Sequence, residues 1–439
     1  MPEASPTIES GGRTHAPGPA TTPGTDAPAS PGRVTHATSA GPSTAPVPPS
    51  IALIGTHGHG TSHLGHIRAI SDSGLVRLTA VVDPRPLAEP AEVADAAAAG
   101  QRLASASDLP DGTVWYPDLD ALLAAGAPDA VILCTPIDTH AALATQALEA
   151  GCDVLLEKPP TASLAELEQL LDTQRRTGRI VQVGFQTYGS HAVRRVREIV
   201  ASGEIGTVTG VGGVGTWLRP DVYWTRARWA GRRTLDGRAV VDGVVTNPLA
   251  HAVATALLLA GASRAEDVAE VELDLAHANP IEADDTSSVR VTTTSGLRVA
   301  LGLTVCATRT TPPHLVVHGT AGRVVLHYTR DLLDVTGPNG TRTETCGRDD
   351  LLENLLAHRA DATVPLLAPL VETGAFMRVL DAVRAAPDPV PIDPRHVDDV
   401  TDDQGRHLVV RGIEDLCSQV AETLSTFREL GAPWTAGAR

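Results

Sequence analysis

The chain has 439 residues, more than one hydrophobic core usually organises, which predicts two folded domains. Its net charge of −17 at pH 7 argues against nucleic acid or an anionic membrane surface as a partner. No apolar run reaches the roughly 20 residues that a membrane-spanning helix needs. The five cysteines form no CxxC pair, so neither a disulfide framework nor a zinc site is indicated. We therefore expect a cytoplasmic protein that acts on a small molecule and holds no metal.

Residues 1–47 are dominated by proline, alanine, threonine, serine and glycine, with no periodic apolar pattern. Such a composition cannot bury enough apolar surface to offset the conformational entropy of an ordered chain. It also lacks the apolar core of a secretory signal. We interpret this segment as a disordered leader.

Short apolar runs alternate with helical patterns from residue 48 to residue 185. The expected strands are 50–54, 76–83, 130–134, 153–156 and 180–183, and the expected helices are 64–70, 91–104, 140–150 and 164–177. This alternation is typical of a doubly wound parallel sheet with helices on both faces. Residues 48–185 are therefore predicted to form one α/β domain.

Closely spaced β-rich runs replace the alternation from about residue 207. The expected strands are 268–275, 287–293, 297–305, 315–318 and 323–328, and helices at 248–260, 366–385 and 413–430 are expected to cover one face of their sheet. Residues 186–439 are thus predicted to form a second α/β domain with an open, largely antiparallel sheet.

The glycine-rich turn GTHGHG, residues 55–60, follows the first predicted strand and opens a helix. Glycines there let backbone N–H groups approach a pyrophosphate, whose charge the helix N-terminus favours. An aspartate about 20 residues further on can bind a ribose hydroxyl, which favours NAD, while an arginine two residues later can accommodate the 2′-phosphate of NADP. A histidine replaces the usual second glycine. The predicted contacts of this Rossmann-type domain with NAD(P) are Gly55, His57, Gly58, Gly60, Asp83 and Arg85.

Two further motifs end parallel strands at the edge where such sheets bind ligands. Thr135 and Pro136 follow one strand and are expected to line the nicotinamide half of the cofactor; His140 is either a cofactor contact or a helix-start residue. Glu157-Lys158 ends the next strand, and Lys158 is the only lysine of the chain. An ammonium can release a proton, which a guanidinium cannot, so a partly desolvated lysine can exchange a proton with a substrate hydroxyl.

These motifs resemble those of the Gfo/Idh/MocA family, the glucose-fructose oxidoreductase and inositol dehydrogenase group. The resemblance extends over nearly all of the chain after residue 47, and its matching stretches are 55–60 with His63, 83–84, 135–136 with His140, Glu157-Lys158-Pro159, 183–185 and 229–232. It implies NAD(H) or NADP(H), a sugar, cyclitol or related polyol as substrate, and a homo-oligomer, a dimer or tetramer. Glu157, Lys158 and Gln186 complete the expected cofactor contacts.

In that family a carboxylate and a histidine, four residues apart at the start of a helix, face the lysine. The matching residues are Asn247 and His251, whose spacing places them on one helical face. Asparagine can orient a hydroxyl but cannot act as a base, which leaves the proton relay to Lys158 and His251. Asn247 is also interpreted as the N-cap of the helix, with Pro248 in its first turn. The helix N-terminus would favour a neutral His251.

Aromatic residues are scarce, at 3% of the chain, yet several lie together at residues 223–232 among arginines. Aromatic faces and guanidinium groups suit the ring face and hydroxyls of a sugar. Packing of a lid or a subunit contact explains the cluster equally well. The predicted substrate contacts are Tyr223, Trp224, Trp229, Arg232, Asn247 and His251.

The sequence therefore predicts an NAD(P)-dependent dehydrogenase or reductase acting on CH–OH groups, with Lys158, His251 and Asn247 as catalytic residues. One alternative is an enzyme that keeps NAD bound and oxidises a sugar ring transiently to permit elimination or hydrolysis. Another is a cofactor-binding sensor without turnover, which the asparagine at position 247 keeps open.

Overall fold

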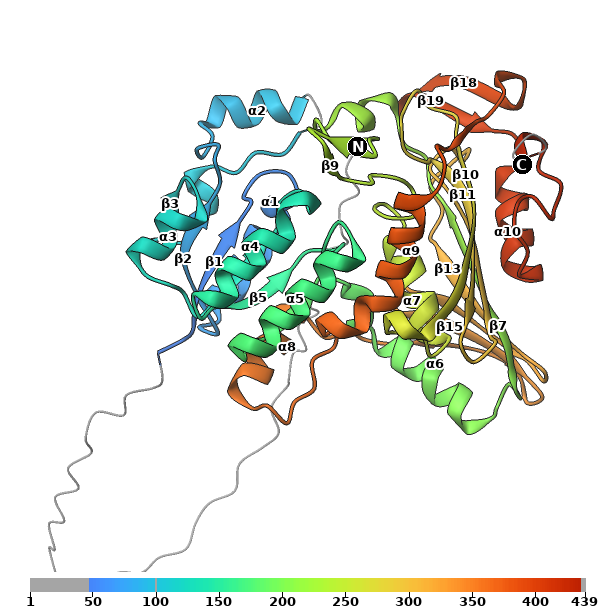
Figure 1. Ribbon diagram of the computed structural model, residues 1–439, viewed down its shortest axis with the longest axis horizontal. Coiled ribbons are helices and arrows are strands. Elements are labelled where there is room, and N and C mark those ends of the chain that lie inside the picture. Colours follow the sequence, from blue (N-terminus) through green and yellow to red (C-terminus); the bar gives the residue numbers. More distant parts are fainter. Residues whose placement is uncertain (1–46, 99–100, 436–439) are drawn as a thin grey trace, which may run out of the picture. The chain divides into compact units, whose positions relative to one another are not determined.

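Two large sheets, one of six strands and one of nine, organise the chain from Pro48 onward (Figure 1). The computed structural model describes residues 47–98 and 101–435. The predicted leader, apart from Val47, lies outside the described residues. Within the described ranges, no helix is both long and apolar enough to cross a membrane.

The six-stranded sheet is parallel throughout, in the order β3-β2-β1-β4-β5-β6. This is a doubly wound order, whose ligands bind outside the carboxyl ends of the strands. The strands β1, β4 and β5 are almost entirely buried, which explains their continuous apolar sequences. The elements are β1 Ser50–Ile54, α1 Gly60–Asp72, β2 Arg77–Val82, α2 Pro90–Ala98, β3 Val114–Tyr116, α3 Leu119–Ala125, β4 Ala130–Leu133, α4 Ile137–Glu149, β5 Asp153–Leu156, α5 Leu164–Thr177 and β6 Val181–Val183. The predicted parallel α/β sheet is confirmed.

The helix expected at 91–104 is too long, because α2 ends at Ala98 and residues 101–104 are not helical. This segment runs beside the glycine-rich turn. The Gly58 N–H donates to the Arg102 carbonyl at 2.8 Å, and the Ala104 N–H donates to His57 Nδ1 at 3.0 Å. These contacts use the backbone groups that a continued helix would have bonded internally.

The nine-stranded sheet has the order β16-β15-β14-β13-β7-β12-β11-β10-β17 and is antiparallel except at β7–β12 and β10–β17. Its strands are β7 Val208–Thr216, β10 Val268–His277, β11 Thr286–Thr293, β12 Arg298–Thr304, β13 His314–Gly319, β14 Arg323–His327, β15 Leu332–Gly337, β16 Gly340–Thr345 and β17 Val390–Pro391. The predicted, largely antiparallel sheet is confirmed. The central strand β7 lies in the region predicted to be β-rich from about residue 207 but was not named as a strand, because its sequence VTGVGGVGT is rich in glycine, a weak strand former.

Helices lie on both faces of this sheet, with α6 His191–Ser202, α7 Ala250–Leu259 and α9 Gly374–Ala385 on one and α10 Ile413–Thr423 on the other (Figure 1). A side chain at Gly215 would meet Leu249, just before α7, whereas one at Gly212 would lie 2.1 Å from the Ala421 carbonyl of α10. Successive strand residues point to opposite faces, so the two helices must too. The expectation that residues 413–430 cover the same face as 248–260 was wrong. Glycine in β7 permits the close approach of α10.

The chain returns to the first sheet after β16. Helix α8 Leu351–Ala360 packs near β5, and Gln182 of β6 accepts hydrogen bonds from the Leu367 and Ala368 N–H groups, both at 3.1 Å. Residues 366–369 therefore extend along β6, and the helix expected at 366–385 begins as α9 only at Gly374. The remaining strands form two separate hairpins. One pairs β8 Thr234–Leu235 with β9 Arg238–Ala239, and the other pairs β18 Val397–Asp402 with β19 Gly405–Val410.

Candidate active site

The glycine-rich turn lies at the carboxyl end of β1, wedged between β4 and α1. Gly55 has φ +88°, and a Cβ there would lie 2.2 Å from the Cys134 carbonyl oxygen. A Cβ at Gly60 would lie 2.0 Å from the Gly55 carbonyl oxygen. Both glycines are therefore needed to close the turn. At Gly58, φ is +63° and a Cβ would meet no described atom within 4 Å, so this glycine borders open space at the N-terminus of α1.

Side chains around the turn are engaged with one another. Asp83 Oδ2 accepts from the Thr56 N–H at 2.9 Å, and its Oδ1 accepts from the Arg85 N–H at 3.0 Å. Both ring nitrogens of His57 lie within hydrogen-bond distance of backbone groups, at residues 85, 86 and 104. Any contact of His57 with a cofactor therefore falls to its backbone. The Arg102 guanidinium, not expected from the sequence, donates to Ser62 Oγ at 2.8 Å beside the same turn.

His140 is buried beneath the next strand end. Its Nδ1 lies 2.8 Å from the Pro159 carbonyl and its Nε2 lies 2.8 Å from the Thr135 carbonyl. Burial lowers the pKa of this imidazole. Both ring nitrogens are thus occupied by backbone carbonyls, and His140 lies in the first turn of α4, as the helix-start interpretation expected. His140 instead holds the turn at Thr135-Pro136 against the Lys158-Pro159 turn.

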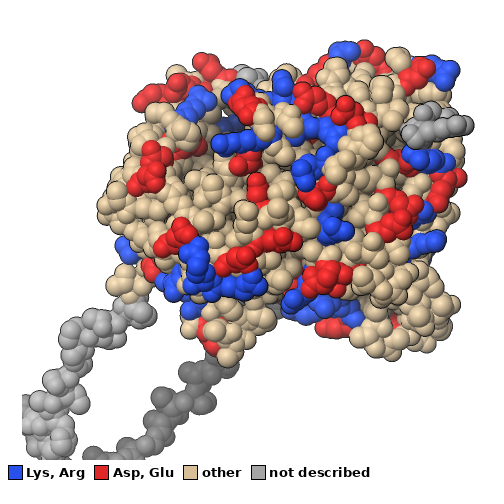
Figure 2. Space-filling view, in the orientation of Figure 1, with Lys and Arg blue, Asp and Glu red and all other residues tan. Residues whose placement is uncertain are grey.

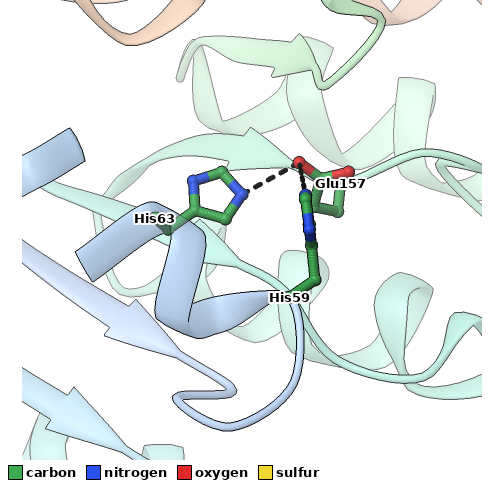
Figure 3. A group of neighbouring side chains, drawn as sticks. All are labelled: His59, His63 and Glu157. Carbon is green, nitrogen blue, oxygen red and sulfur yellow. Dashed lines mark hydrogen bonds and ion pairs between the residues drawn. The ribbon is translucent and has the colours of Figure 1, made fainter. Parts of the chain in front are cut away.

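Glu157 collects hydrogen bonds from two elements of the site (Figure 3). His63 Nε2, on α1, lies 2.9 Å from Glu157 Oε1, and His59 Nε2, at the start of α1, lies 3.7 Å from it. Gln186 Nε2 donates to the same oxygen at 3.2 Å. Burial raises the pKa of this carboxyl, but the His63 hydrogen bond and the charges of His63, His59 and Lys158 outweigh it and lower the pKa to about 2. Glu157 therefore ties α1 to the end of β5.

Lys158 follows directly and faces Asn247. Its Nζ donates to Asn247 Oδ1 at 2.7 Å and to the Asn247 carbonyl at 3.2 Å. Burial lowers the pKa of Lys158, whereas the charges of Glu157 and Asp242 raise it by less. An amine with a lowered pKa carries a larger neutral fraction at pH 7 and can accept a proton.

Asn247 is not the N-cap that the sequence suggested. Helix α7 begins at Ala250 with Leu249 at the N-cap, and Asn247 lies in the preceding turn. Its side chain instead bridges Lys158 and Asp242, to which Asn247 Nδ2 donates at 2.5 Å. Asp242 was not expected from the sequence, because a lone aspartate five residues before an asparagine carries no signal of its own.

His251, in the first turn of α7, lies within electrostatic range of Lys158. Its Nδ1 is buried and has no hydrogen-bond partner among the described residues. Burial, and then the charge of Lys158, lowers the pKa of His251 to about 3. The imidazole is therefore neutral at pH 7, as a proton acceptor must be. The main cause is burial, whereas the sequence had suggested the helix N-terminus.

This lowered pKa predicts a pH dependence of stability. Between pH 6.5 and about 3 the unfolded chain binds a proton at position 251 that the folded chain excludes, so the free energy of unfolding falls as the pH falls through this window. When the pH is lowered from 6.5 to 4.5, the free energy of unfolding of the parent should fall by up to about 2 kcal/mol more than that of His251→Leu. Urea denaturation at each pH measures this difference. His396→Leu, in the short helix Pro394–His396, is the control. Equal losses in all three proteins would contradict the burial of a neutral His251.

The aromatic segment packs around an arginine. The Arg226 guanidinium lies 3.7 Å from the ring centre of Tyr223 and 4.6 Å from that of Trp229. Trp224 Nε1 is buried with no partner among the described residues, and Arg232 pairs with Glu282. A cavity of about 550 Å³ is lined by this segment, but not by the residues around Lys158. Two of the expected substrate contacts, Trp224 and Arg232, thus line a cavity that Lys158, Asn247 and His251 do not line.

Charge is mixed on the face of the molecule that Figure 2 shows. Figure 2 shows acidic and basic side chains interspersed over one face, with no continuous basic surface there. The arginines near the aromatic segment illustrate the pattern, because Arg228 pairs with Asp236 and Arg406 pairs with Asp221 and Asp399.

The parallel sheet and the glycine-rich turn after β1 have the architecture of a Rossmann-type domain. The model of the oxidoreductase family with an NAD-binding Rossmann fold, GFO/IDH/MocA, matches residues 50–185, and that of the GFO/IDH/MocA C-terminal domain matches residues 193–325. Together these matches cover more than half of the chain. The chain belongs to the GFO/IDH/MocA family, and its first domain is the NAD-binding domain of that family.

Relatives with named activities match only part of the chain. D-glucoside 3-dehydrogenase of Escherichia coli is 33% identical over 25% of this chain and 30% of its own. Inositol 2-dehydrogenase of Leifsonia xyli is 34% identical over 37% of this chain and 44% of its own. This chain thus spans less than half the length of each of these two relatives.

A solved structure extends the likeness to the whole fold. The WlbA dehydrogenase from Bordetella pertussis, solved with NADH and UDP-GlcNAcA, has a TM-score of 0.59 and 22% identity, covering 79% of this chain and 100% of that one. At this identity the match establishes the shared fold.

Proposed function

We propose that the protein transfers a hydride between a nicotinamide and a secondary alcohol of a sugar, cyclitol or related polyol, with Lys158 as the proton-transfer group. The observation that carries the proposal is the placement of Lys158. It lies at the carboxyl end of β5, beside the glycine-rich turn, with its Nζ directed at Asn247 and within electrostatic range of His251. This is the edge of a parallel sheet at which dinucleotides bind.

The residues present fit NAD(H). The open space at Gly58 adjoins the N-terminus of α1, where backbone N–H groups favour a pyrophosphate, and the Arg102 guanidinium adds positive charge beside the same turn. Asp83 lies at the end of β2, where a carboxylate favours the ribose hydroxyls of NAD over the 2′-phosphate of NADP. Bound there, the nicotinamide supplies the hydride chemistry.

The protein contributes proton transfer and orientation. During oxidation the neutral Lys158 amine accepts the hydroxyl proton of the substrate, and during reduction the ammonium returns it. Two of the three ammonium hydrogens are held by Asn247, which leaves one direction for the substrate. His251, neutral at pH 7, is the second acceptor for a substrate hydroxyl. Oxidation should therefore accelerate as the pH rises towards the pKa of Lys158, and reduction should slow.

Support for a polyol substrate comes from the relatives that act on a glucoside and on inositol. The test is an absorbance assay at the NADH band with NAD⁺ and a panel of inositols, glucosides and UDP-linked sugars. We expect NADH to accumulate steadily with at least one of them. Product formed with only catalytic amounts of NAD⁺, and no accumulation of NADH, would replace the proposal with the elimination or hydrolysis alternative. Binding of NADH without any product would favour the sensor.

A further inference from the structure

Asn247 has one possible orientation between its two neighbours. Lys158 Nζ lies 2.7 Å from Asn247 Oδ1, and an ammonium can only donate. The Asp242 carboxylate lies 2.5 Å from Asn247 Nδ2, and a carboxylate can only accept. The opposite amide orientation would place two donors and two acceptors face to face. Asp242 therefore determines which atom of Asn247 meets the lysine.

Asp242 is itself held rigidly. Its side chain is 3% exposed and accepts from Arg226 Nη2 at 3.0 and 2.8 Å and from the Gly231 N–H at 2.8 Å. Arg226 is fixed in turn by the faces of Tyr223 and Trp229. Hydrogen bonds to charged groups that are buried and geometrically constrained are the strong ones. A continuous chain of contacts thus connects the aromatic segment to Lys158 by way of Arg226, Asp242 and Asn247.

We infer that Asp242 is a positioning residue for Lys158: it orients the Asn247 amide that holds the amine and supplies the negative charge that Asn247 lacks. The two tasks are divided between the two residues, with the hydrogen-bond acceptor at Asn247 and the charge at Asp242. Only the expected effect on turnover rests on the proposed function; the effect on the charge state of Lys158 does not.

The charged and titratable groups that face Lys158 come from several elements. Glu157 precedes it, Asp242 and Arg226 lie in the 221–247 segment, and the others are Cys134 after β4, His251 on α7 and His59 before α1. Asp242 raises the pKa of Lys158 and Arg226 lowers it. Asp242→Asn removes the charge that raises the pKa of Lys158 and keeps the Arg226 charge that lowers it, so the pKa of Lys158 should fall.

The single lysine allows a direct measurement. Protein labelled with ¹³C at lysine Cε carries one labelled side chain, so one NMR resonance reports the protonation of Lys158 without any turnover. We expect its midpoint to fall by about one pH unit in Asp242→Asn. The matched control is Asp153→Asn, because Asp153 is also buried, 2% exposed, and paired with an arginine, Arg359, but lies outside the site. The control should leave the midpoint unchanged.

A reciprocal exchange separates positioning from general damage. Asn247→Asp would set a second carboxylate against Asp242, so this variant should melt at a lower temperature than the parent. Adding Asp242→Asn restores one amide and one carboxylate in exchanged places. The double variant should have a Lys158 midpoint above that of the parent, because the carboxylate is now adjacent to the amine.

The inference is overturned if Asp242→Asn moves the Lys158 midpoint no more than Asp153→Asn does. If Asp242→Asn does not fold, Asp242→Glu decides: it keeps the charge, so its midpoint should remain near that of the parent, and a fall like that expected for the asparagine variant contradicts the role of charge. A shifted midpoint in a protein that never produces NADH would uphold the inference and reject the proposed function. With an active parent, the pH profile of kcat/KM should move in the same direction as the resonance.

Discussion

Replacing Lys158 with arginine is expected to reduce turnover by about a hundredfold to ten-thousandfold while leaving NADH affinity within several-fold of the parent. Arginine keeps the positive charge but cannot release a proton at working pH. The amine of Lys158 lies where two hydrogen bonds to Asn247 hold it. His251→Ala should be the next most damaging change. Steady-state rates on the substrate found in the panel, with NADH titrations of each variant, give the measurement.

Two controls accompany this experiment. Arg175→Lys is the reverse exchange between arginine and lysine at an exposed position, where Arg175 forms an ion pair with Asp172 on α5. This variant should retain the parental rate. Melting temperatures show whether Lys158→Arg folds, since a guanidinium is larger than the ammonium it replaces. A folded Lys158→Arg enzyme that turns over at the parental rate would show that the lone lysine takes no part in proton transfer.

Placing tryptophan at position 58 is expected to weaken NADH binding by ~100-fold or more, equivalent to about 2.7 kcal/mol. No described atom beyond the neighbouring residues would lie within 4 Å of a Cβ at Gly58, so the indole would occupy the open space beside the N-terminus of α1. Isothermal titration with NADH measures the affinity. Gly55 and Gly60 are unsuitable for this test because a side chain at either would collide with backbone oxygens.

Gly58→Asn is the matched control for Gly58→Trp. The φ of +63° at this position is one that asparagine tolerates better than other side chains, so the two variants separate backbone strain from bulk. The asparagine variant should bind NADH within about tenfold of the parent. Unchanged affinity in the folded tryptophan variant would mean that the cofactor does not approach this turn.

The class of fold could be predicted because its signals are local. Buried parallel strands appear as continuous apolar runs, and the turn at residues 55–60 follows β1 directly, so both were visible along the chain. The same locality explains the errors. The helix at 91–104 was extended through residues whose backbone groups bond to the glycine-rich turn, and β7 was missed because glycine hides its strand character.

The site was predictable only where a motif marked it. Lys158 was identified by its motif and its uniqueness, but the partners of its amine are set by residues distant in sequence. His140 was a candidate cofactor contact, yet its burial against two backbone carbonyls gives it a structural role. Asp242 and Arg226 had no motif at all, because their significance arises from contacts with Asn247 and with the rings of Tyr223 and Trp229.

Sequence alone was enough for the parallel sheet, the family and the glycine-rich turn after β1, since apolar periodicity and glycine spacing act over a few neighbouring residues. Packing in three dimensions was required to show that α10 covers the face opposite α7 and that Asn247 bridges a lysine and an aspartate instead of capping a helix. Those features depend on which surfaces fit together and on which donors meet acceptors. Such matches join residues far apart along the chain, where no local pattern records them.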